Sequence, residues 1–458
     1  MLVDTNLKRL IEKYDRPGPR YTSYPTAREF HEGVGSKDYL GALGGLRPGE
    51  GLSLYIHVPF CEHRCTYCGC YVIPTRDRAI ADSYLRHLKK EIEIVRHQVP
   101  APARVSSVHL GGGTPTYLSP PQLEDLFESL RNLFDIEQGS EISVEIDPRV
   151  TTKEHLEALR RIGVNRLSLG VQDTSDEVQE AIGRHQGRES TIGFFQLCRE
   201  TGFDSINIDL VYGLPLQTSE RFAKTLGDVL ALRPERIAAF GYAHVPWIRS
   251  NQKAIAPETL PGPRERMELY LMAHQRITDA GYAHIGLDHF ALPGDELSRA
   301  RGEGRLGRSF MGYTPRRDAK VVGLGVSSIG DLGNGYFQSE KKLSRYFDRI
   351  DEGDLPVERG FLASKDDLLR RSVIHDVLCN LKVDFEAFDR MAGGPFPRYF
   401  SPEMKDLVEL EEDGLVEIGS TALAVKPAGR LFLRNIAMPF DRYLRWGQVA
   451  EGRFSRTV

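Results

Sequence analysis

Short runs of β-favouring residues alternate with longer helical patterns through the middle of this 458-residue chain. The runs that predict strands span residues 52–58, 105–110, 141–146, 166–171, 205–211 and 236–242. Helical patterns lie near residues 80–97, 120–134, 153–162, 188–201, 218–231 and 264–280, and a weaker strand pattern follows near 283–287. Such alternation is typical of parallel strands covered by helices. It predicts an α/β fold, either an open doubly wound sheet or a barrel.

Polar or glycine-rich residues stand where nearly every predicted strand ends. They are Gly111 to Gly113 with Thr114 after the second strand, Glu145 and Asp147 at the third, Gln172 and Asp173 at the fourth, Asp209 and Tyr212 at the fifth, and Tyr242 and His244 at the sixth. A single aspartate in such a place could simply begin a turn or cap a helix. Five strand ends in succession instead favour one shared site, as in TIM-like barrels. With about six βα units rather than eight, we expect a partial (β/α)6 barrel.

Three cysteines follow the first predicted strand with the spacing CxxxCxxC, at Cys61, Cys65 and Cys68. Thiolates at this spacing can bind one [4Fe–4S] cluster and leave its fourth iron without a protein ligand. An electron carrier normally supplies four thiolates, so an open iron indicates a site that binds a reactant. A zinc site is the alternative, and it would need a fourth ligand such as His57 or His63.

The other cysteines have separate interpretations. Cys70 could be a fourth cluster ligand, but the single residue between it and Cys68 favours a role outside the ligand set. Cys198 and Cys379 lie in apolar helical patterns and are expected to be small buried residues. Six cysteines in a chain of this length, with a charged N-terminus that does not read as a secretory signal, argue against a disulfide scaffold.

Charge and composition limit the classes of partner that this protein is expected to bind. The net charge is −4 and the basic residues are dispersed, which gives nucleic acid no electrostatic footprint. No apolar run reaches the ~20 residues that a membrane helix needs. We therefore expect a cytoplasmic protein without membrane or nucleic-acid partners, and a monomer because one chain carries the whole predicted site.

Two regions flank the barrel pattern. Residues 1–45 are rich in turn formers and aromatics and are expected to form an irregular N-terminal arm, followed by the barrel at 46–355. Residues 356–458 are expected to form a small winged-helix-like α+β cap. Its patterns are helices near 365–380 and 403–413, strands at 415–418 and 422–425, and a helix that opens at Pro427.

Seven segments together resemble those of the oxygen-independent coproporphyrinogen III oxidases, a family of radical S-adenosylmethionine (SAM) enzymes. They are PRYTSYPTA (19–27), YIHVPFCEHRCTYCGC (55–70), GGGTPTYL (111–118), VEIDPR (144–149), RLSLGVQ (166–172), NIDLVYGLP (207–215) and GYAHVP (241–246). The resemblance runs in order from about residue 14 to the C-terminus. CxxxCxxC alone indicates only the superfamily, whereas the PRYTSYP segment and Cys70 select the family.

The resemblance implies an activity. Two propionate side chains of coproporphyrinogen III would be oxidatively decarboxylated to vinyl groups without oxygen, giving protoporphyrinogen IX in haem biosynthesis, by a 5′-deoxyadenosyl radical derived from SAM. It implies a [4Fe–4S] cluster, two molecules of SAM, and an electron donor such as a flavodoxin or ferredoxin. The cofactors would carry the difficult step, while the protein supplies position and excludes water.

The resemblance also implies roles for individual residues. Cys61, Cys65 and Cys68 would bind the cluster. The cofactor-binding residues would be Tyr55, Tyr67, Gly112, Gly113, Thr114, Glu145, Gln172, Arg184, Asp209, Ala243 and Ile329; Gln172, Arg184 and Asp209 would line the second SAM, and Ala243 and Ile329 would lie near the adenosines. Catalytic or substrate contacts are expected from Tyr55, Arg20, Arg308 and Phe310. Tyr55 can also be read as a core residue of a strand, and Arg184 as a solvated residue at a helix end.

The segment RSFMGYTP (308–315) departs from the family-like RNFQGYTT, with Ser309 for asparagine and Met311 for glutamine. A lost amide removes a hydrogen bond of about 0.5–1.5 kcal/mol, which puts the contacts to substrate or electron acceptor in doubt. Three alternatives stay open. They are a haem chaperone that binds and delivers haem on the same barrel, a haem-modifying radical SAM methyltransferase, and a zinc-stabilised barrel without redox chemistry. The PRYTSYP segment and Cys70 argue against the chaperone.

Overall fold

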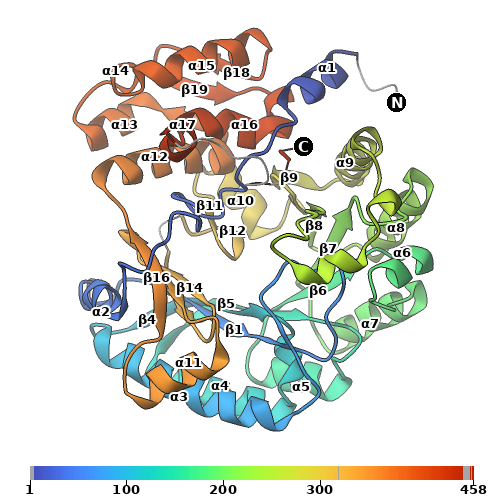
Figure 1. Ribbon diagram of the computed structural model, residues 1–458, viewed down its shortest axis with the longest axis vertical. Coiled ribbons are helices and arrows are strands. Elements are labelled where there is room, and N and C mark those ends of the chain that lie inside the picture. The colour runs from blue at the N-terminus through green and yellow to red at the C-terminus, as the bar shows by residue number, and fades with distance from the viewer. Residues whose placement is uncertain (1–4, 318, 447–453, 455, 458) are drawn as a thin grey trace.

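The computed structural model describes residues 5–317, 319–446, 454, 456 and 457. Figure 1 shows two lobes, a larger one built around a curved sheet and a smaller one formed by the C-terminal segment, with the N-terminal helix lying beside the smaller lobe. The larger lobe contains the predicted barrel.

Six parallel strands form the centre of a twelve-stranded sheet. They are β1 (Leu52–Val58), β4 (Arg104–Gly112), β5 (Asp135–Ile146), β6 (Arg166–Gln172), β7 (Ile206–Tyr212) and β8 (Arg236–Gly241). Each pairs in parallel with the next. The edge strands of this sheet do not pair with each other within the described ranges. The predicted partial (β/α)6 barrel is therefore confirmed, although β5 begins earlier than expected.

Shorter strands extend the sheet at both edges. On one side β10 (His289–Ala291) pairs antiparallel with β8, and β9 (Ala283–Gly286) with β10. On the other side β13 (Lys320–Leu324) pairs in parallel with β1. The antiparallel strands β14 (Ile329–Asp331), β15 (Gly335–Ser339) and β16 (Val357–Leu362) follow it. Sequence patterning missed β13 to β16, because strands of three to six residues hold too few alternations to stand out.

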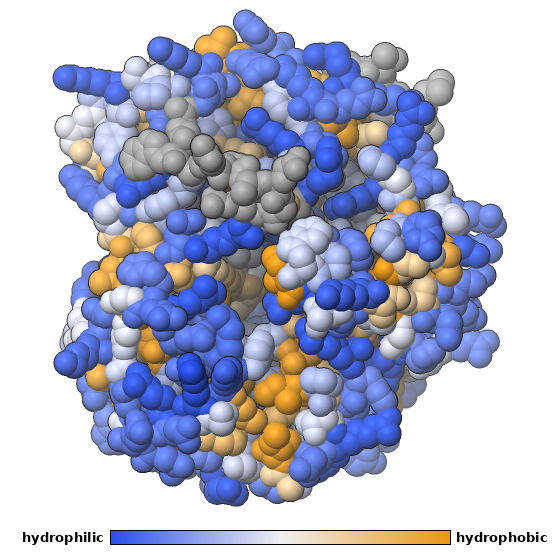
Figure 2. All heavy atoms as spheres, viewed as in Figure 1, coloured by the Kyte–Doolittle hydropathy of each residue, from blue (hydrophilic) through white to orange (hydrophobic). Residues whose placement is uncertain are grey.

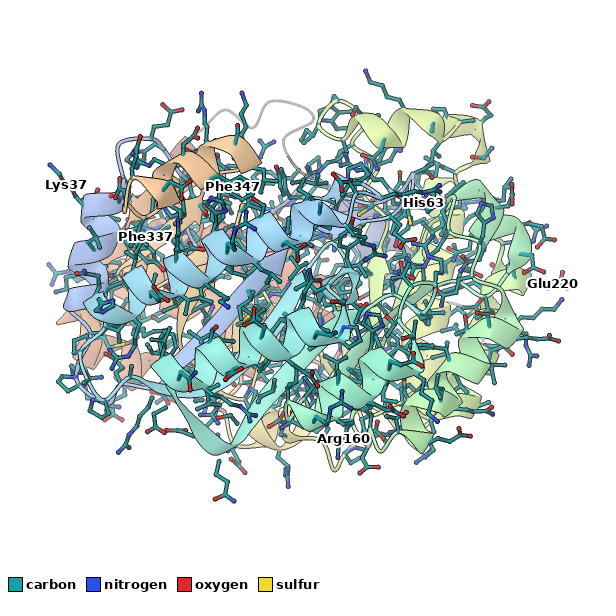
Figure 3. All side chains as sticks on the ribbon, turned by 90° about the horizontal axis from the view of Figure 1, so that it is seen from below. Lys37, His63, Arg160, Glu220, Phe337 and Phe347 are labelled. Atoms are coloured by element: carbon teal, nitrogen blue, oxygen red, sulfur yellow. The ribbon has the colours of Figure 1, made fainter. Side chains whose placement is uncertain are left out.

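Amphipathic helices cover the outer face of the sheet. They are α3 (Ala79–Gln98), α4 (Pro120–Leu133), α5 (Lys153–Arg161), α6 (Asp176–Ala181), α7 (Arg188–Glu200), α8 (Ser219–Leu232), α9 (Pro263–Asp279), α10 (Glu296–Gly302) and α11 (Leu343–Asp351). The helix α3 buries Leu85, Leu88 and Ile92 along one stripe. Figure 3 shows α3 and α4 lying across the sheet, with Phe347 of α11 close to α3, where its ring stacks on His87 at 4.0 Å. The helices fill one face of the sheet and leave the other for the site.

The N-terminal arm is irregular only in its middle. It begins with α1 (Thr5–Tyr14) and ends with α2 (Ser36–Gly44), because both segments carry an apolar stripe. Tyr21 and Tyr24, in the irregular part, are buried in the core of the smaller lobe. The arm thus contributes side chains to the C-terminal core.

The smaller lobe combines helices with a three-stranded antiparallel sheet of order β17-β19-β18, as the winged-helix-like prediction expects. Its elements are α12 (Lys365–His375), a π-helical turn (Asp376–Asn380), β17 (Lys382–Asp384), α13 (Phe385–Ala392), α14 (Phe396–Tyr399), α15 (Ser401–Glu412), β18 (Val416–Ile418), β19 (Ala422–Val425), α16 (Leu433–Ala437) and α17 (Arg442–Trp446). Pro427 precedes a 3-10 helix (Ala428–Phe432) rather than an α-helix. The strand β16 lies after residue 355 in the sequence but belongs to the large sheet. The domain boundaries at residues 45 and 355 stay a prediction. Among the described helices, none has the length and apolar character to cross a membrane.

Candidate active site

A cavity of about 450 Å³ lies at the carboxyl ends of the parallel strands. Strand ends form part of its wall, and the rest comes from the cysteine loop that follows β1, the N-terminal arm and the segment 308–312. Figure 2 shows the molecule hollowed between its two lobes. The cavity therefore lies where the strand-end pattern predicts a shared site.

Most of the predicted site residues line this cavity. They are Arg20, Tyr55, Cys61, Cys65, Tyr67, Cys68, Gly112, Gly113, Thr114, Glu145, Gln172, Arg184, Asp209, Arg308 and Phe310. Ala243 and Ile329 lie outside this lining. Ala243 follows β8, where its carbonyl accepts a hydrogen bond from Gln252 (3.1 Å), and Ile329 begins β14. The structure brings the residues together, while their individual roles stay predictions.

The cysteine loop is closed at its base by a two-stranded contact. The short strand β2 (Phe60–Cys61) pairs in parallel with β3 (Ile73–Pro74). The Thr75 amide donates to the Cys61 carbonyl at 2.9 Å. This pairing folds the chain back so that Cys61, Cys65 and Cys68 share one wall of the cavity.

Two guanidinium groups lie against the buried Cys65 sulfur. Arg149 Nη2 is 3.6 Å and Arg184 Nη1 is 3.9 Å from Cys65 Sγ. Asp147 orients both, at 2.6 Å from Arg149 and 3.4 Å from Arg184. Cations attract a negatively charged atom. The position of Cys65 is therefore suited to an anionic sulfur ligand.

The remaining thiols have different environments. Burial raises the pKa of Cys61 to about 12, and its Sγ lies 3.4 Å from Thr114 Oγ1. A hydrogen bond with the Cys70 thiol lowers the pKa of Cys68 to about 6. Cys70 also lines the cavity. Whether Cys70 stays outside the ligand set remains a prediction.

The donor set fits an iron–sulfur cubane. Three thiols face one cavity, and two arginines there can balance the negative charge of thiolate ligands. Within the described part of the chain, no three His, Cys, Asp or Glu side chains converge as they would around a single metal ion. A cubane takes one thiolate on each of three irons, so its ligands need not converge on one point.

Two amide side chains far along the sequence hold the backbone of the cysteine loop. Asn251 Nδ2 donates to the carbonyls of Cys65 (3.2 Å), Thr66 (2.9 Å) and Cys68 (3.0 Å). Gln252 Nε2 donates to the Tyr67 carbonyl at 2.9 Å. Both residues belong to a 3-10 helix, Ser250–Ala254. They fix the loop that carries two of the three thiols.

We expect Asn251→Ala to weaken cluster retention, because one amide holds three carbonyls of the loop. Loss of a group that orients metal ligands typically costs about 10- to 100-fold in metal affinity. The measurement is the time course of iron release to a chelator from anaerobically reconstituted protein. Ser250→Ala, an exposed position of the same 3-10 helix, is the control and should release iron at the wild-type rate. Equal rates for Asn251→Ala and wild type would contradict this role.

A histidine that sequence analysis missed supports Glu145 and Tyr55. His109 Nε2 lies 3.4 Å from Glu145 Oε1, and the Gly112 amide donates to Glu145 Oε2 at 3.0 Å. The His109 ring stacks on Tyr55 with centroids 5.9 Å apart. Burial opposes ionisation of Glu145, but these hydrogen bonds outweigh it and lower the pKa of Glu145. The carboxylate is therefore available to a cationic amine in the cavity.

The glycines after β4 are required by close backbone packing. Gly112 has a φ of +116°, which side-chain-bearing residues rarely adopt. A Cβ on Gly113 would lie 2.6 Å from the Phe60 carbonyl oxygen. The Gly113 amide donates to the Val58 carbonyl at 2.8 Å. The glycines thus seat the strand end against the start of the cysteine loop, which places both in the cavity wall.

A second polar group lies at the ends of β6 and β7. Arg184 is buried, and its Nη2 donates to the Gly170 carbonyl at 2.5 Å, so the reading of Arg184 as a solvated residue is wrong. Asp209 accepts from Asn207 (2.8 Å) and Ser168 (3.1 Å), and burial raises its pKa to about 6. This group is held by hydrogen bonds within the protein and presents polar atoms to the cavity.

Asp173, which also follows a predicted strand, does not belong to the site. It is fully buried and accepts hydrogen bonds from Gln217 (2.6 Å) and Thr225 (2.7 Å). Gln172 adopts a φ of +70°, so the chain turns there. Gln172 lines the cavity, while Asp173 joins a structural hydrogen-bond network outside it.

Arg308 presents an incompletely bonded cation to the cavity. It lies in β11 (Gly307–Ser309), which pairs with β12 (Gly312–Thr314). Its side chain is buried 4.7 Å over the Tyr313 ring, and neither Nε nor Nη1 has a hydrogen-bond partner among the described residues. Buried polar groups are normally paired, so such a guanidinium indicates a site for an anion.

The neighbours of Arg308 complete this wall. Phe310 packs between the rings of Phe30 (6.4 Å) and Tyr336 (6.0 Å). Met311 lines the cavity, and its amide donates to the Ser309 hydroxyl at 3.2 Å. The departures from the family-like sequence therefore lie in the wall of the site.

Sequence reasoning missed several residues of the cavity. They are Arg64, Val72, His109, Ile146, Arg149, Ser168, Gly170, Asn207, Phe240, Asp288 and His289; His63, named above only as a zinc ligand, also lines the cavity. His109 shares a strand face with Gly111, so strand alternation carried a signal for it. Arg149 lies in the turn after β5, where no alternation applies. No local pattern singles out Asn251 or Gln252.

Comparisons with known proteins agree with this geometry. Residues 55–229 match the family model of the Radical SAM superfamily, and residues 363–432 match that of the HemN C-terminal domain. The chain is 44% identical over 451 residues to the oxygen-independent coproporphyrinogen III oxidase of Salmonella typhimurium, covering 98% of each sequence. The enzyme of that name from Pseudomonas aeruginosa is 43% identical over 453 residues, again covering 98% of each. The solved structure of coproporphyrinogen III oxidase from Escherichia coli, described as a radical SAM enzyme, superposes with a TM-score of 0.91 at 42% identity, over 95% of this chain and 99% of that one.

Proposed function

This chain belongs to the family of oxygen-independent coproporphyrinogen III oxidases, which are radical SAM enzymes. From that premise we propose which of its residues bind the cluster, SAM and the substrate. It is an oxidoreductase of haem biosynthesis whose reaction is the oxidative decarboxylation of coproporphyrinogen III. The family implies a [4Fe–4S] cluster and SAM. Membership of this family argues against the three alternatives, a haem chaperone, a haem-modifying methyltransferase and a zinc-stabilised barrel.

Cys61, Cys65 and Cys68 hold the cluster, with Arg149 and Arg184 balancing the charge at Cys65. When bound, cluster and SAM supply the one-electron chemistry that removes a hydrogen atom from a substrate propionate. The protein contributes position and excludes water.

Two groups of residues support binding of two SAM molecules. The first group lines the same cavity as the cluster thiols and consists of Tyr55, Tyr67, Gly112 to Thr114 and Glu145. The Glu145 carboxylate would accept hydrogen bonds from the ammonium of the first SAM. Gln172, Arg184 and Asp209 lie at the ends of other strands and form the second group. Equilibrium dialysis with labelled SAM against cluster-loaded protein counts the bound molecules.

The substrate carries four propionates and is therefore anionic. Arg308 and Arg20 face the same cavity as the cluster thiols, and Phe310 lies beside them. The unpaired Nε and Nη1 of the buried Arg308 are the observation that carries this assignment. A carboxylate would satisfy both donors and neutralise the charge, as arginine does in bidentate pairs.

The reaction also needs a reductant, and a small donor such as a flavodoxin or ferredoxin suits an iron–sulfur site. The predicted cluster and cofactor residues meet in a single cavity of the chain, which supports a monomer. The six cysteines are unpaired, and a thiolate-bound cluster needs reducing surroundings, which supports a cytoplasmic location.

An anaerobic assay tests the proposed function. Reconstituted protein receives a reductant, SAM and coproporphyrinogen III, and the products are separated by chromatography. We expect the assay to yield 5′-deoxyadenosine together with a divinyl product. Cleavage of SAM without any vinyl product, in protein that binds coproporphyrinogen, would overturn it.

A further inference from the structure

A small recess opens beside the main cavity, between α9, the end of β8 and the C-terminal lobe. Arg20 and Asp288 line both the recess and the cavity, so the two spaces share a wall. Tyr212, expected from its strand end to face the shared site, lines the recess and not the cavity. The recess thus adjoins the site.

The recess is strongly cationic. Its described lining holds five arginines and a single acidic residue, Asp288; the arginines are Arg20, Arg266, Arg430, Arg434 and Arg456. Arg20 Nη1 lies 3.7 Å from Asp288 Oδ2, and Arg456 pairs with Asp15 at 2.5 Å. Burial and the neighbouring charge of Arg20 lower the pKa of Arg434 to about 10. Positive charge therefore exceeds negative charge around this space.

Among these five arginines, Arg266 gives the clearest indication that the recess binds a ligand. Its Nε is buried and has no hydrogen-bond partner among the described residues. Its Nη2 lies 3.3 Å from the position that a Cβ on Gly241 would take, and Arg20 Nη2 donates to the Gly241 carbonyl at 2.6 Å. Arg20 and Arg266 therefore both approach Gly241, the last residue of β8. A buried guanidinium nitrogen with an unused donor is costly unless an acceptor meets it.

The size of the recess limits what can enter. Its volume is about 30 Å³, somewhat more than the ~10–15 Å³ of such space that one water molecule needs. Such a space accepts a water molecule or the carboxylate end of a chain, and it excludes a pyrrole ring. The positive charge of the recess and its small volume both fit a single carboxylate group of a larger molecule that lies in the cavity.

We propose that this recess binds the carboxylate of a substrate propionate that is not reacting, with Arg266 and Arg20 as its donors. The inference rests on the proposed function and adds a specificity-determining residue, Arg266, to it. Anchoring one propionate at a fixed place in the wall orients the macrocycle, and orientation decides which other propionate faces the cluster thiols. The recess thereby selects the reacting side chain without taking part in the chemistry.

The test compares Arg266→Met, Arg266→Lys and wild type with anaerobically reconstituted protein and coproporphyrinogen III. Losing hydrogen bonds to a charged group costs about 1.5–3 kcal/mol, which is roughly 10- to 150-fold in KM. We expect such a rise in KM for Arg266→Met, a smaller rise for Arg266→Lys, and partial rescue of an Arg266→Ala variant by added guanidinium. Rescue by guanidinium distinguishes a carboxylate donor from a residue that only packs. Cluster absorption and SAM binding should stay at wild-type values, which verifies folding.

Arg276→Met is the matched control, because Arg276 lies on the same helix but is exposed and outside the recess. Its KM should equal that of wild type. If wild type converts the substrate and Arg266→Met shows an unchanged KM, the recess assignment fails and the proposed function stands. If wild type forms no vinyl product at all, the proposed function fails and the recess assignment falls with it.

Discussion

Protein with Cys65→Ala is expected to hold no [4Fe–4S] cluster after anaerobic reconstitution and to form no product. Cys65 is buried between Arg149 and Arg184, at 3.6 and 3.9 Å from their nitrogens, and its loss leaves two cations without the sulfur they face. With two thiolates left of three, the cubane loses the ligand on one iron. Iron and sulfide content, with the absorption spectrum, measure the outcome.

Cys198→Ala is the control for this experiment. Cys198 is buried in α7, away from the cavity lining, where it behaves as a small apolar residue. That variant should carry the same iron and sulfide as wild type. A full cluster spectrum in Cys65→Ala, or an equal loss in Cys198→Ala, would contradict the ligand assignment.

Arg308→Met is expected to raise the KM for coproporphyrinogen III strongly while leaving the substrate-free protein at least as stable as wild type. Truncating one partner of a buried charge pair costs about 2–5 kcal/mol, or roughly 30- to several-thousand-fold in KM. In the absence of substrate the same guanidinium has two unsatisfied nitrogens, so its removal relieves a desolvation cost. Steady-state kinetics and thermal unfolding measure the two effects.

Arg305→Met is the matched control, since Arg305 is exposed in the neighbouring segment and pairs with Glu303. Its KM should not change. A lower unfolding temperature for Arg308→Met with an unchanged KM would show that Arg308 has a structural role and does not bind substrate.

The barrel could be predicted from the sequence because its six parallel strands are long and their helices strongly amphipathic. The strand ends then predicted the cavity, and the cysteine spacing predicted its chemistry. The short strands β13 to β16 could not be predicted, since strands of three to six residues hold too few alternations to stand out. Asp173 was misplaced because a positive φ at Gln172 changes which side chain faces the site.

The residues that support the site could not be predicted from the sequence, because their roles depend on contacts formed only in the folded chain. Asn251 acts through one amide on three backbone carbonyls, and such contacts leave no spacing or periodicity. Arg266 lies on a helix where charged residues are normally solvated, and only the approach of β8 and the C-terminal lobe encloses it. Arg184 likewise depends on the tertiary fold for its burial.

Electron paramagnetic resonance of the reduced protein, recorded with and without SAM, tests the central claim most directly. Three thiolates on a cubane leave one iron open to a small ligand, so a reduced [4Fe–4S] signal should appear and should change when SAM is added. In Cys65→Ala no such signal should form. A cluster signal in wild type that is identical with and without saturating SAM would contradict the account.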